Sequence, residues 1–290
     1  AVLVTAGAGS GKTRMLTHRI AYMVKELGIN PNNILAITFT NKAANEMKDR
    51  LQKMIDSLGD MWVCTFHAMC SKILRYNISL LGYTSSFSIY GDSETDRVIK
   101  RILESDKIKA LFSNKKLEEE MNVKTLSWHI SNAKNNLMSP DEYSKYIRDE
   151  KKCRIITEVY KDYEDTLFAS NALDFDDLLT KTYELLTKHP TTLEFYQNKF
   201  KYIHVDEFQD TNTSQYELVK LLAAKHKNVF AVGDEDQCIY SWRGAQVANV
   251  KQYTIDFKDC KIFKLEQNYR STKKIIALAI QKCAADQASE

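Results

Sequence analysis

The chain has 290 residues, of which 44% are apolar and 27% are charged, and its net charge is +3. This composition is ordinary for a soluble globular protein and excludes disorder as the main state. The apolar runs are much shorter than the roughly 20 residues of a membrane-spanning helix, and we see no secretory leader. We therefore expect a cytoplasmic protein without a membrane partner, made of about two domains or of one domain with a large insertion.

Charge distribution and cysteine content narrow the class of partner only slightly. The first 85 residues hold ten Lys and Arg against five Asp and Glu, which is compatible with a phosphate-bearing partner, although such an excess alone is usually a solvated surface. The six cysteines form no Cys-x-x-Cys pair, so we expect free thiols in a reducing compartment. Cys64, His67 and Cys70 are spaced like metal ligands, but no fourth ligand follows at a recognisable spacing, which argues against zinc.

Strands and helices alternate through the first part of the chain. The pattern predicts strands at 1–6, 34–40 and 61–66, and helices at 12–27, 41–55 and 67–81. Residues 86–175 break this pattern: they are polar and irregular, and no glycine occurs from 92 to 232, so we predict an inserted helical subdomain. Alternation resumes with strands at 202–207, 228–234 and 260–266, and helices at 214–226, 245–257 and 272–285. We therefore predict an α/β fold with a parallel sheet, interrupted by an inserted all-helical subdomain.

The strongest chemical signal is the segment AGAGSGKT at residues 6–13, between a predicted strand and a predicted helix. That context is typical of a P-loop, in which backbone N–H groups and a helix N-terminus hold phosphate. Lys12 would reach the β- and γ-phosphates, and Thr13 would place a hydroxyl on Mg²⁺. The general pattern begins with glycine, whereas this chain has Ala6 there. The alternative is a glycine-rich turn without a ligand.

An acidic pair ends the predicted strand in YIHVDEFQD at residues 202–210. Ligands of open α/β sheets lie beyond the carboxyl ends of the strands. Asp206 can hold Mg²⁺ through water, and Glu207 can orient and deprotonate an attacking water. Alone, the pair could be a surface turn, but together with a P-loop it predicts nucleotide hydrolysis.

The loop VGDEDQCIYSWRGA at residues 232–245 also follows a predicted strand. Gln237 could sense a γ-phosphate. Tyr240, Trp242 and Arg243 could stack on unpaired bases and contact their backbone. The alternative for the two aromatic residues is a place in the core.

Three shorter segments carry weaker signals. In EQNYRST at residues 266–272, Arg270 could neutralise phosphate charge and Tyr269 could stack on adenine, or the segment could simply start a helix. After the second predicted strand, Phe39 could stack on a base, and Thr40 and Asn41 could bind phosphate. The segment with Thr65 and His67 repeats this geometry. Helix capping is the alternative for both of these segments.

The ordered set of motifs resembles that of superfamily 1A DNA helicases of the UvrD/Rep/PcrA type, most nearly the PcrA-like members. The motifs are AGAGSGKT, TFTNKAA, TFHAMC, LDFDDLL, VDEFQDTN, VGDEDQCIYSWRGA and LEQNYRST, and they span the chain. The resemblance implies a RecA-like P-loop NTPase lobe, called 1A, with a helical insertion, called 1B. The implied boundaries are 1–85 and 176–264 for the lobe, 86–175 for the insertion, and 265–290 for a linker or the start of a second RecA-like lobe.

The resemblance also implies roles for individual residues. The nucleotide-binding residues would be Ala8, Gly9, Ser10, Gly11, Lys12, Thr13, Arg14 and Tyr269. Hydrolysis would involve Lys12, Asp206, Glu207, Gln237 and Arg270, with Thr13 and Asp206 at Mg²⁺. The DNA-binding residues would be Phe39, Thr40, Asn41, Thr65, His67, Tyr240, Trp242 and Arg243.

The implied function is the ATP- and single-stranded-DNA-binding N-terminal half of an ATP-dependent 3′–5′ DNA helicase in repair or replication. Its cofactors would be ATP and Mg²⁺, and its partners single-stranded and partly duplex DNA, the C-terminal helicase lobes, and repair or replication proteins. Two alternatives stay open: a nucleotide-gated DNA-binding or protein-docking module without catalysis, and the motor part of a helicase–nuclease subunit. Because an arginine from a second lobe can contribute about 10³–10⁵ in rate, we expect slow hydrolysis and no unwinding by these 290 residues alone.

Overall fold

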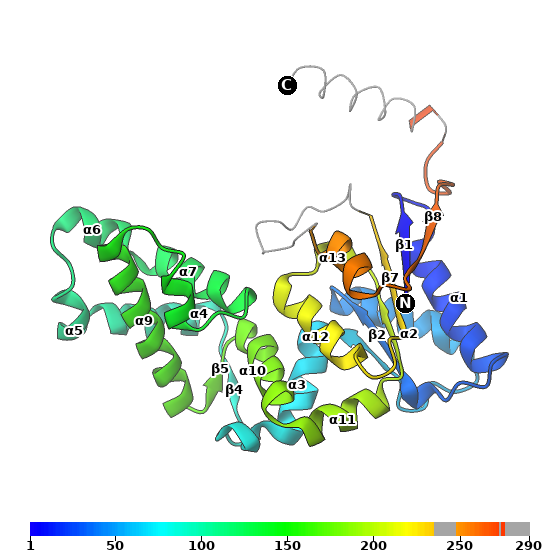
Figure 1. Ribbon diagram of the computed structural model, residues 1–290, viewed down its shortest axis with the longest axis horizontal. Coiled ribbons are helices and arrows are strands. Elements are labelled where there is room, and N and C mark those ends of the chain that lie inside the picture. Colours follow the sequence, from blue (N-terminus) through cyan, green and yellow to red (C-terminus); the bar gives the residue numbers. More distant parts are fainter. Residues whose placement is uncertain (235–247, 273, 276–290) are drawn as a thin grey trace.

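A parallel sheet forms the centre of the larger lobe in the computed structural model, which describes residues 1–234, 248–272 and 274–275 (Figure 1). In this part of the chain every neighbouring pair of its strands is parallel. The strand order is β3 (Trp62–Thr65), β2 (Ile34–Thr38), β6 (Tyr202–Val205), β7 (Val229–Gly233), β1 (Val2–Ala6), β8 (Lys261–Leu265). The predicted α/β fold with a parallel sheet is therefore confirmed. Since β6 and β7 lie between β2 and β1, segments distant in sequence end at the same edge.

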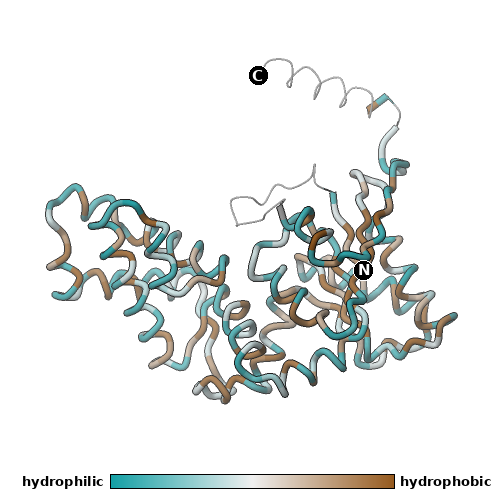
Figure 2. The backbone as a smooth tube through the Cα atoms, viewed as in Figure 1, coloured by the Kyte–Doolittle hydropathy of each residue, from teal (hydrophilic) through white to brown (hydrophobic). Residues whose placement is uncertain are grey.

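Helices cover both faces of the sheet. Successive residues of a strand point to opposite faces, so they belong to two different apolar cores. Leu3 and Leu35 belong to one apolar core, whereas their neighbours Val4 and Ala36 belong to the other. Figure 2 shows apolar segments in the interior of this lobe and also in the insertion. The covering helices are α1 (Lys12–Lys25), α2 (Asn41–Gln52), α3 (Phe66–Asn77), α10 (Phe175–Lys188), α11 (Pro190–Lys199), α12 (Thr213–Ala223) and α13 (Ala248–Asp256). Single-turn helices are η1 (Pro31–Asn33), η2 (Ile78–Leu81) and η3 (Phe208–Asp210). No helix in the described residues has the length and apolar content to cross a membrane.

The insertion is a second group of helices with its own apolar core, at the left of Figure 1. Its helices are α4 (Asp92–Leu103), α5 (Asp106–Lys109), α6 (Lys115–Glu120), α7 (Val123–Asn135), α8 (Pro140–Ser144) and α9 (Glu150–Ala169). The prediction of an all-helical insertion needs one correction, because β4 (Ser88–Ile89) and β5 (Ala172–Leu173) pair in parallel. The chain enters and leaves the insertion at these strands, where backbone N–H and C=O groups form hydrogen bonds between them. Strands of two residues are too short to give a sequence pattern, and β5 lies within the long glycine-free run.

The described ends of the other predicted elements lie within four residues of the observed ones, and the largest difference is at α3, which ends at Asn77 and continues as η2. Helices α10 and α11 had not been predicted as separate elements. The start of the predicted helix at 245–257 and most of the one at 272–285 lie outside the described residues.

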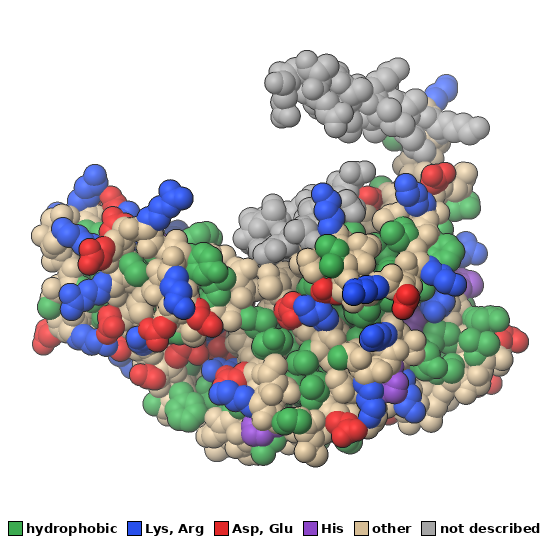
Figure 3. Space-filling view, in the orientation of Figure 1, with side chains coloured by type: hydrophobic (Ala, Val, Ile, Leu, Met, Phe, Trp, Pro, Cys, Tyr) green, Lys and Arg blue, Asp and Glu red, His purple; other side chains and the backbone are tan. Residues whose placement is uncertain are grey.

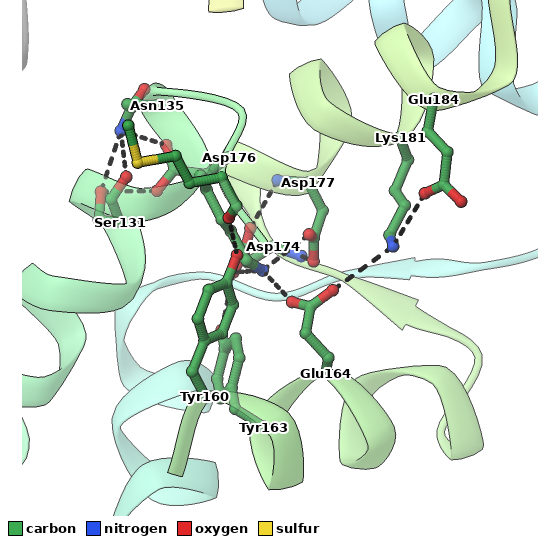
Figure 4. A network of polar contacts seen from close by, with 12 residues as sticks. Ser131, Asn135, Tyr160, Tyr163, Glu164, Asp174, Asp176, Asp177, Lys181 and Glu184 are labelled. Carbon is green, nitrogen blue, oxygen red and sulfur yellow. Dashed lines mark hydrogen bonds and ion pairs between the residues drawn. The ribbon is translucent and has the colours of Figure 1, made fainter. Parts of the chain in front are cut away.

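A buried lysine joins the insertion to the larger lobe. Lys134 of α7 is 1% exposed, and its Nζ lies 2.8 Å from Asp174 Oδ2, 2.7 Å from Asp177 Oδ1 and 2.7 Å from Glu164 Oε1. Figure 4 shows these three carboxylates converging from the start of α10 and from α9. Burial would lower the pKa of Lys134, but the charges of the carboxylates outweigh it and raise that pKa well above its ordinary value. The lysine therefore stays charged at ordinary pH.

We expect Lys134→Met to lower the free energy of unfolding by roughly 3–5 kcal/mol, because it leaves buried carboxylates without their cation. Urea denaturation measures this loss. Lys152→Met is the matched control, since Lys152 pairs with Glu120 on the surface, and it should have little effect. Equal losses in both variants would contradict a stabilising role for the buried lysine.

Candidate nucleotide site and adjoining cleft

The loop between β1 and α1 has the backbone and the side chains of a phosphate site. Gly9 and Gly11 have φ angles of 72° and 89°, in the left-handed region that favours glycine. Ser10 and Lys12 are buried, and Ser10 Oγ and Lys12 Nζ have no hydrogen-bond partner within the described residues. Buried polar atoms without a partner are costly unless a ligand satisfies them. Together with the N-terminus of α1, they fit the phosphates of a nucleotide.

The acidic pair lies directly against this loop. Thr13 Oγ1 donates a hydrogen bond of 2.9 Å to Asp206 Oδ2, and Lys12 Nζ lies 3.3 Å from Glu207 Oε2. Asp206 follows β6, and its N–H donates to Ile37 O of the neighbouring β2. The structure therefore brings together two segments that are 193 positions apart. Thr13 and Asp206 are the residues that could hold Mg²⁺.

Burial changes the acidity of this site. It raises the pKa of Asp206 to about 6, with the negative charge of Glu207 as a second cause, against smaller opposing effects of Thr13 and Lys12. Burial and Glu207 also raise the pKa of Asp210 to about 6. Asp206 is therefore poised to lose a proton near neutral pH, and a divalent cation would favour its charged form.

The segment that follows β8 packs on the outer side of the phosphate loop. Tyr269 N–H donates to Gly9 O at 2.9 Å, and Asn268 Nδ2 donates to Ala8 O at 2.6 Å. A Cβ at Gly9 would lie 2.5 Å from Arg270 Cβ, so only glycine allows this approach. Tyr269 and Arg270 thus lie beside the loop. Asn268 is a contact that sequence reasoning missed, although it stood inside a quoted motif.

A cleft of about 850 Å³ lies between the larger lobe and the insertion. Of the predicted DNA-binding residues it is lined by Phe39, Thr40 and His67. Residues without a predicted role also line it, and they include Trp128, Phe175, Asp176, Asp210 and Asn212. On the face drawn in Figure 3, the insertion carries a mixture of positive and negative side chains. Phe175 and Asp176 belong to the motif LDFDDLL, which could have pointed to them, whereas no motif contains Trp128.

Two of the predicted DNA-binding residues have capping roles in the structure. Thr40 Oγ1 accepts from Ala43 N–H at the start of α2, and Thr65 Oγ1 accepts from Ala68 N–H at the start of α3. Thr40 therefore caps α2, and Asn41 is the first residue of that helix. Neither Asn41 nor Thr65 is among the residues that line the cleft.

The remaining predicted site residues are distributed as follows. Arg14 is exposed on the first turn of α1. The following residues lie outside the part of the chain that the structure describes: Gln237, Tyr240, Trp242 and Arg243.

The parallel sheet, the phosphate loop and the acidic pair define a P-loop nucleotide-binding lobe of the RecA-like type. The family model of the UvrD/REP helicase N-terminal domain matches residues 1–258, and the chain belongs to this family. It is 48% identical over 279 residues to proteins named ATP-dependent DNA helicase PcrA from Staphylococcus epidermidis and Staphylococcus aureus. The match covers 96% of this chain and 37% of each relative, so the chain spans little more than a third of these curated relatives.

We expect the affinity for a Mg²⁺–nucleotide complex to rise with pH through about 6, because Asp206 must be ionised to hold the metal. Below that pH the affinity should fall about tenfold per pH unit. Calorimetry with a non-hydrolysable ATP analogue between pH 5 and 8 measures this. Asp206→Asn keeps the titration of the nucleotide and of Asp210, so its affinity should still change with pH, but less steeply than that of the wild-type protein. An identical pH dependence in both proteins would contradict the assignment.

Proposed function

We propose that this chain is the ATP- and single-stranded-DNA-binding lobe of an ATP-dependent 3′–5′ DNA helicase that acts in DNA repair or replication. The observation that carries the proposal is the contact of Lys12 and Thr13 with Glu207 and Asp206. A silent docking module would not need this full set of charges around one loop. We further propose 86–175 as a unit of its own, supported by its separate core.

In this proposal the side chains divide the work of phosphoryl transfer. The loop N–H groups and Lys12 bind the phosphates, and Arg270 beside Gly9 adds positive charge. Mg²⁺ on Thr13 and Asp206 would neutralise charge that develops on the phosphates. Glu207 orients the attacking water and accepts its proton. Tyr269, 78% exposed beside the loop, is available to stack on adenine.

The cleft is proposed as part of the single-stranded DNA path. Its aromatic residues Phe39, Trp128 and Phe175 offer ring faces to bases, and stacking tolerates any sequence. Its charged residues are mainly acidic, with Asp92, Asp96, Asp176 and Asp210 against Lys124. This chemistry suits bases and their amino groups better than phosphates. Gln237, Tyr240, Trp242 and Arg243 remain proposed contacts to γ-phosphate and DNA.

We expect the full-length protein to hydrolyse ATP faster with single-stranded DNA and to unwind duplexes with a 3′ tail. Glu207→Gln should lower the rate of hydrolysis by about 10²–10⁴ while nucleotide binding persists, whereas Lys12→Ala should weaken both. The 290-residue chain alone should bind the nucleotide but turn over slowly. The proposal would be refuted if Glu207→Gln hydrolysed ATP at the wild-type rate, or if single-stranded DNA did not change the rate of the wild-type protein.

We expect Phe175→Ala to weaken the binding of a short oligo-dT by about 1–3 kcal/mol, which is the loss of one stacked base. Fluorescence anisotropy measures this affinity. Phe195→Ala is the control, because Phe195 of α11 is also exposed but does not line the cleft. If both variants bind the oligonucleotide equally well, the cleft is not part of the DNA path.

A further inference from the structure

A buried glutamine connects the acidic pair to the neighbouring strand. Gln209 of η3 is 1% exposed. Its Nε2 donates to Glu207 Oε2 at 2.9 Å, and its Oε1 accepts from Asp234 N–H at 2.9 Å. Asp234 directly follows β7. One amide group therefore links the ends of two adjacent parallel strands.

The surroundings of Gln209 determine which way its amide points. The backbone N–H of Asp234 requires an oxygen opposite it, while the carboxylates of Glu207 and Asp210 require the NH₂ group. Asp210 Oδ2 lies 3.4 Å from Nε2, on the same side as Glu207. Both sets of neighbours select the same orientation, so the donor faces the carboxylate of Glu207.

The end of β7 packs closely on this side chain. A Cβ at Gly233 would lie 2.7 Å from Gln209 Oε1 and 3.2 Å from Gln209 N. Contacts under 3.0 Å are not tolerated by real side chains without a shift, so this approach requires glycine. The position of the Gln209 amide is thus restricted by the close approach of Gly233 and by its hydrogen bonds to Glu207, Asp210 and Asp234.

The side chain of Glu207 is held by few other contacts, and its backbone conformation is unfavourable. Its φ angle is 51°, a left-handed conformation that disfavours residues other than glycine, and its side chain is 37% exposed. Lys12 and Gln209 both contact its Oε2, and within the described residues Oε1 has no hydrogen-bond or ion-pair partner. Since Lys12 is proposed to bind phosphate, Gln209 is the contact that does not depend on the nucleotide.

We propose that Gln209 is a positioning residue that holds Oε2 of Glu207 and so directs Oε1 toward the attacking water. Through the Asp234 N–H, it also ties the orientation of Glu207 to the end of β7. The inference rests on the proposed function, in which Glu207 acts as the base. Gln209 itself does not touch the reacting atoms in this assignment.

The test compares variants of the full-length protein in steady-state ATP hydrolysis with single-stranded DNA present. Gln209→Glu keeps an oxygen for the Asp234 N–H but replaces the donor to Glu207 by a carboxylate oxygen. Gln209→Met removes the hydrogen bonds of the amide to Glu207, Asp210 and Asp234 without adding charge. Gln197→Met is the matched control, because Gln197 is a partly buried glutamine of α11 that donates to Leu221 O outside the candidate site.

We expect kcat to fall about 10- to 100-fold in both Gln209 variants, the range found when a partner that orients site residues is lost. The KM for ATP and the Kd of Mg²⁺ with a non-hydrolysable ATP analogue should stay close to the wild-type values. Gln197→Met should keep the wild-type kcat. Gly233→Ala, whose Cβ would displace the Gln209 amide, should lower kcat in the same way.

Thermal unfolding of each variant separates loss of fold from loss of positioning. A folded Gln209→Glu or Gln209→Met protein with the wild-type kcat would overturn the inference, as would a loss confined to nucleotide affinity. If Gln209→Met does not fold, the kcat and nucleotide affinity of Gln209→Glu and Gly233→Ala test the inference in the same way. A wild-type protein that does not hydrolyse ATP would instead refute the proposed function.

Discussion

The contact between the phosphate loop and the acidic pair depends on the order of the parallel strands. The carboxyl ends of parallel strands meet at one edge of a sheet, and β6 and β7 are inserted between β2 and β1. Thr13 and Asp206 therefore come within hydrogen-bond distance although most of the chain separates them. A different strand order would keep every motif but separate the cation from the carboxylates. The nucleotide chemistry proposed for this chain requires this one arrangement.

Buried charge is used in two different ways in this molecule. At the base of the insertion, Lys134 is surrounded by carboxylates that satisfy it, and the group holds α7, α9 and α10 together. At the phosphate loop, Lys12 is also buried, but within the described residues Glu207 is the one carboxylate at ion-pair distance from its ammonium. The first arrangement is complete without a ligand and contributes to stability. The second is incomplete, and incomplete buried charge is typical of a site that binds a charged ligand.

The insertion contacts the nucleotide lobe close to the acidic pair. Asn212, two residues after Asp210, donates a hydrogen bond to Asn135 of α7, and Asn135 in turn donates to Asp176 of α10. These residues line the cleft, and η3 between β6 and α12 carries Gln209. The proposed base, its positioning residue and one wall of the proposed DNA path thus lie on a single short segment. A shift of this segment would therefore change both the nucleotide site and the proposed DNA path.

Local patterns in the sequence determined the phosphate loop, the acidic pair, the alternating strands and helices, and the helical insertion, because each depends on neighbouring residues and their period. Tyr269 and Arg270 carried only a weak local signal, which the family resemblance strengthened, since one loop does not reveal what it packs against. Tertiary structure alone decided the strand order, the pairing of β4 with β5, the cation of the buried carboxylates, and the partners of Gln209. All of these are contacts between segments far apart in the chain, and they arise only when the sheet and the insertion pack. Trp128 is the clearest case: it has an ordinary place on a helix, and only the packing of α7 beside α10 brings it to the cleft.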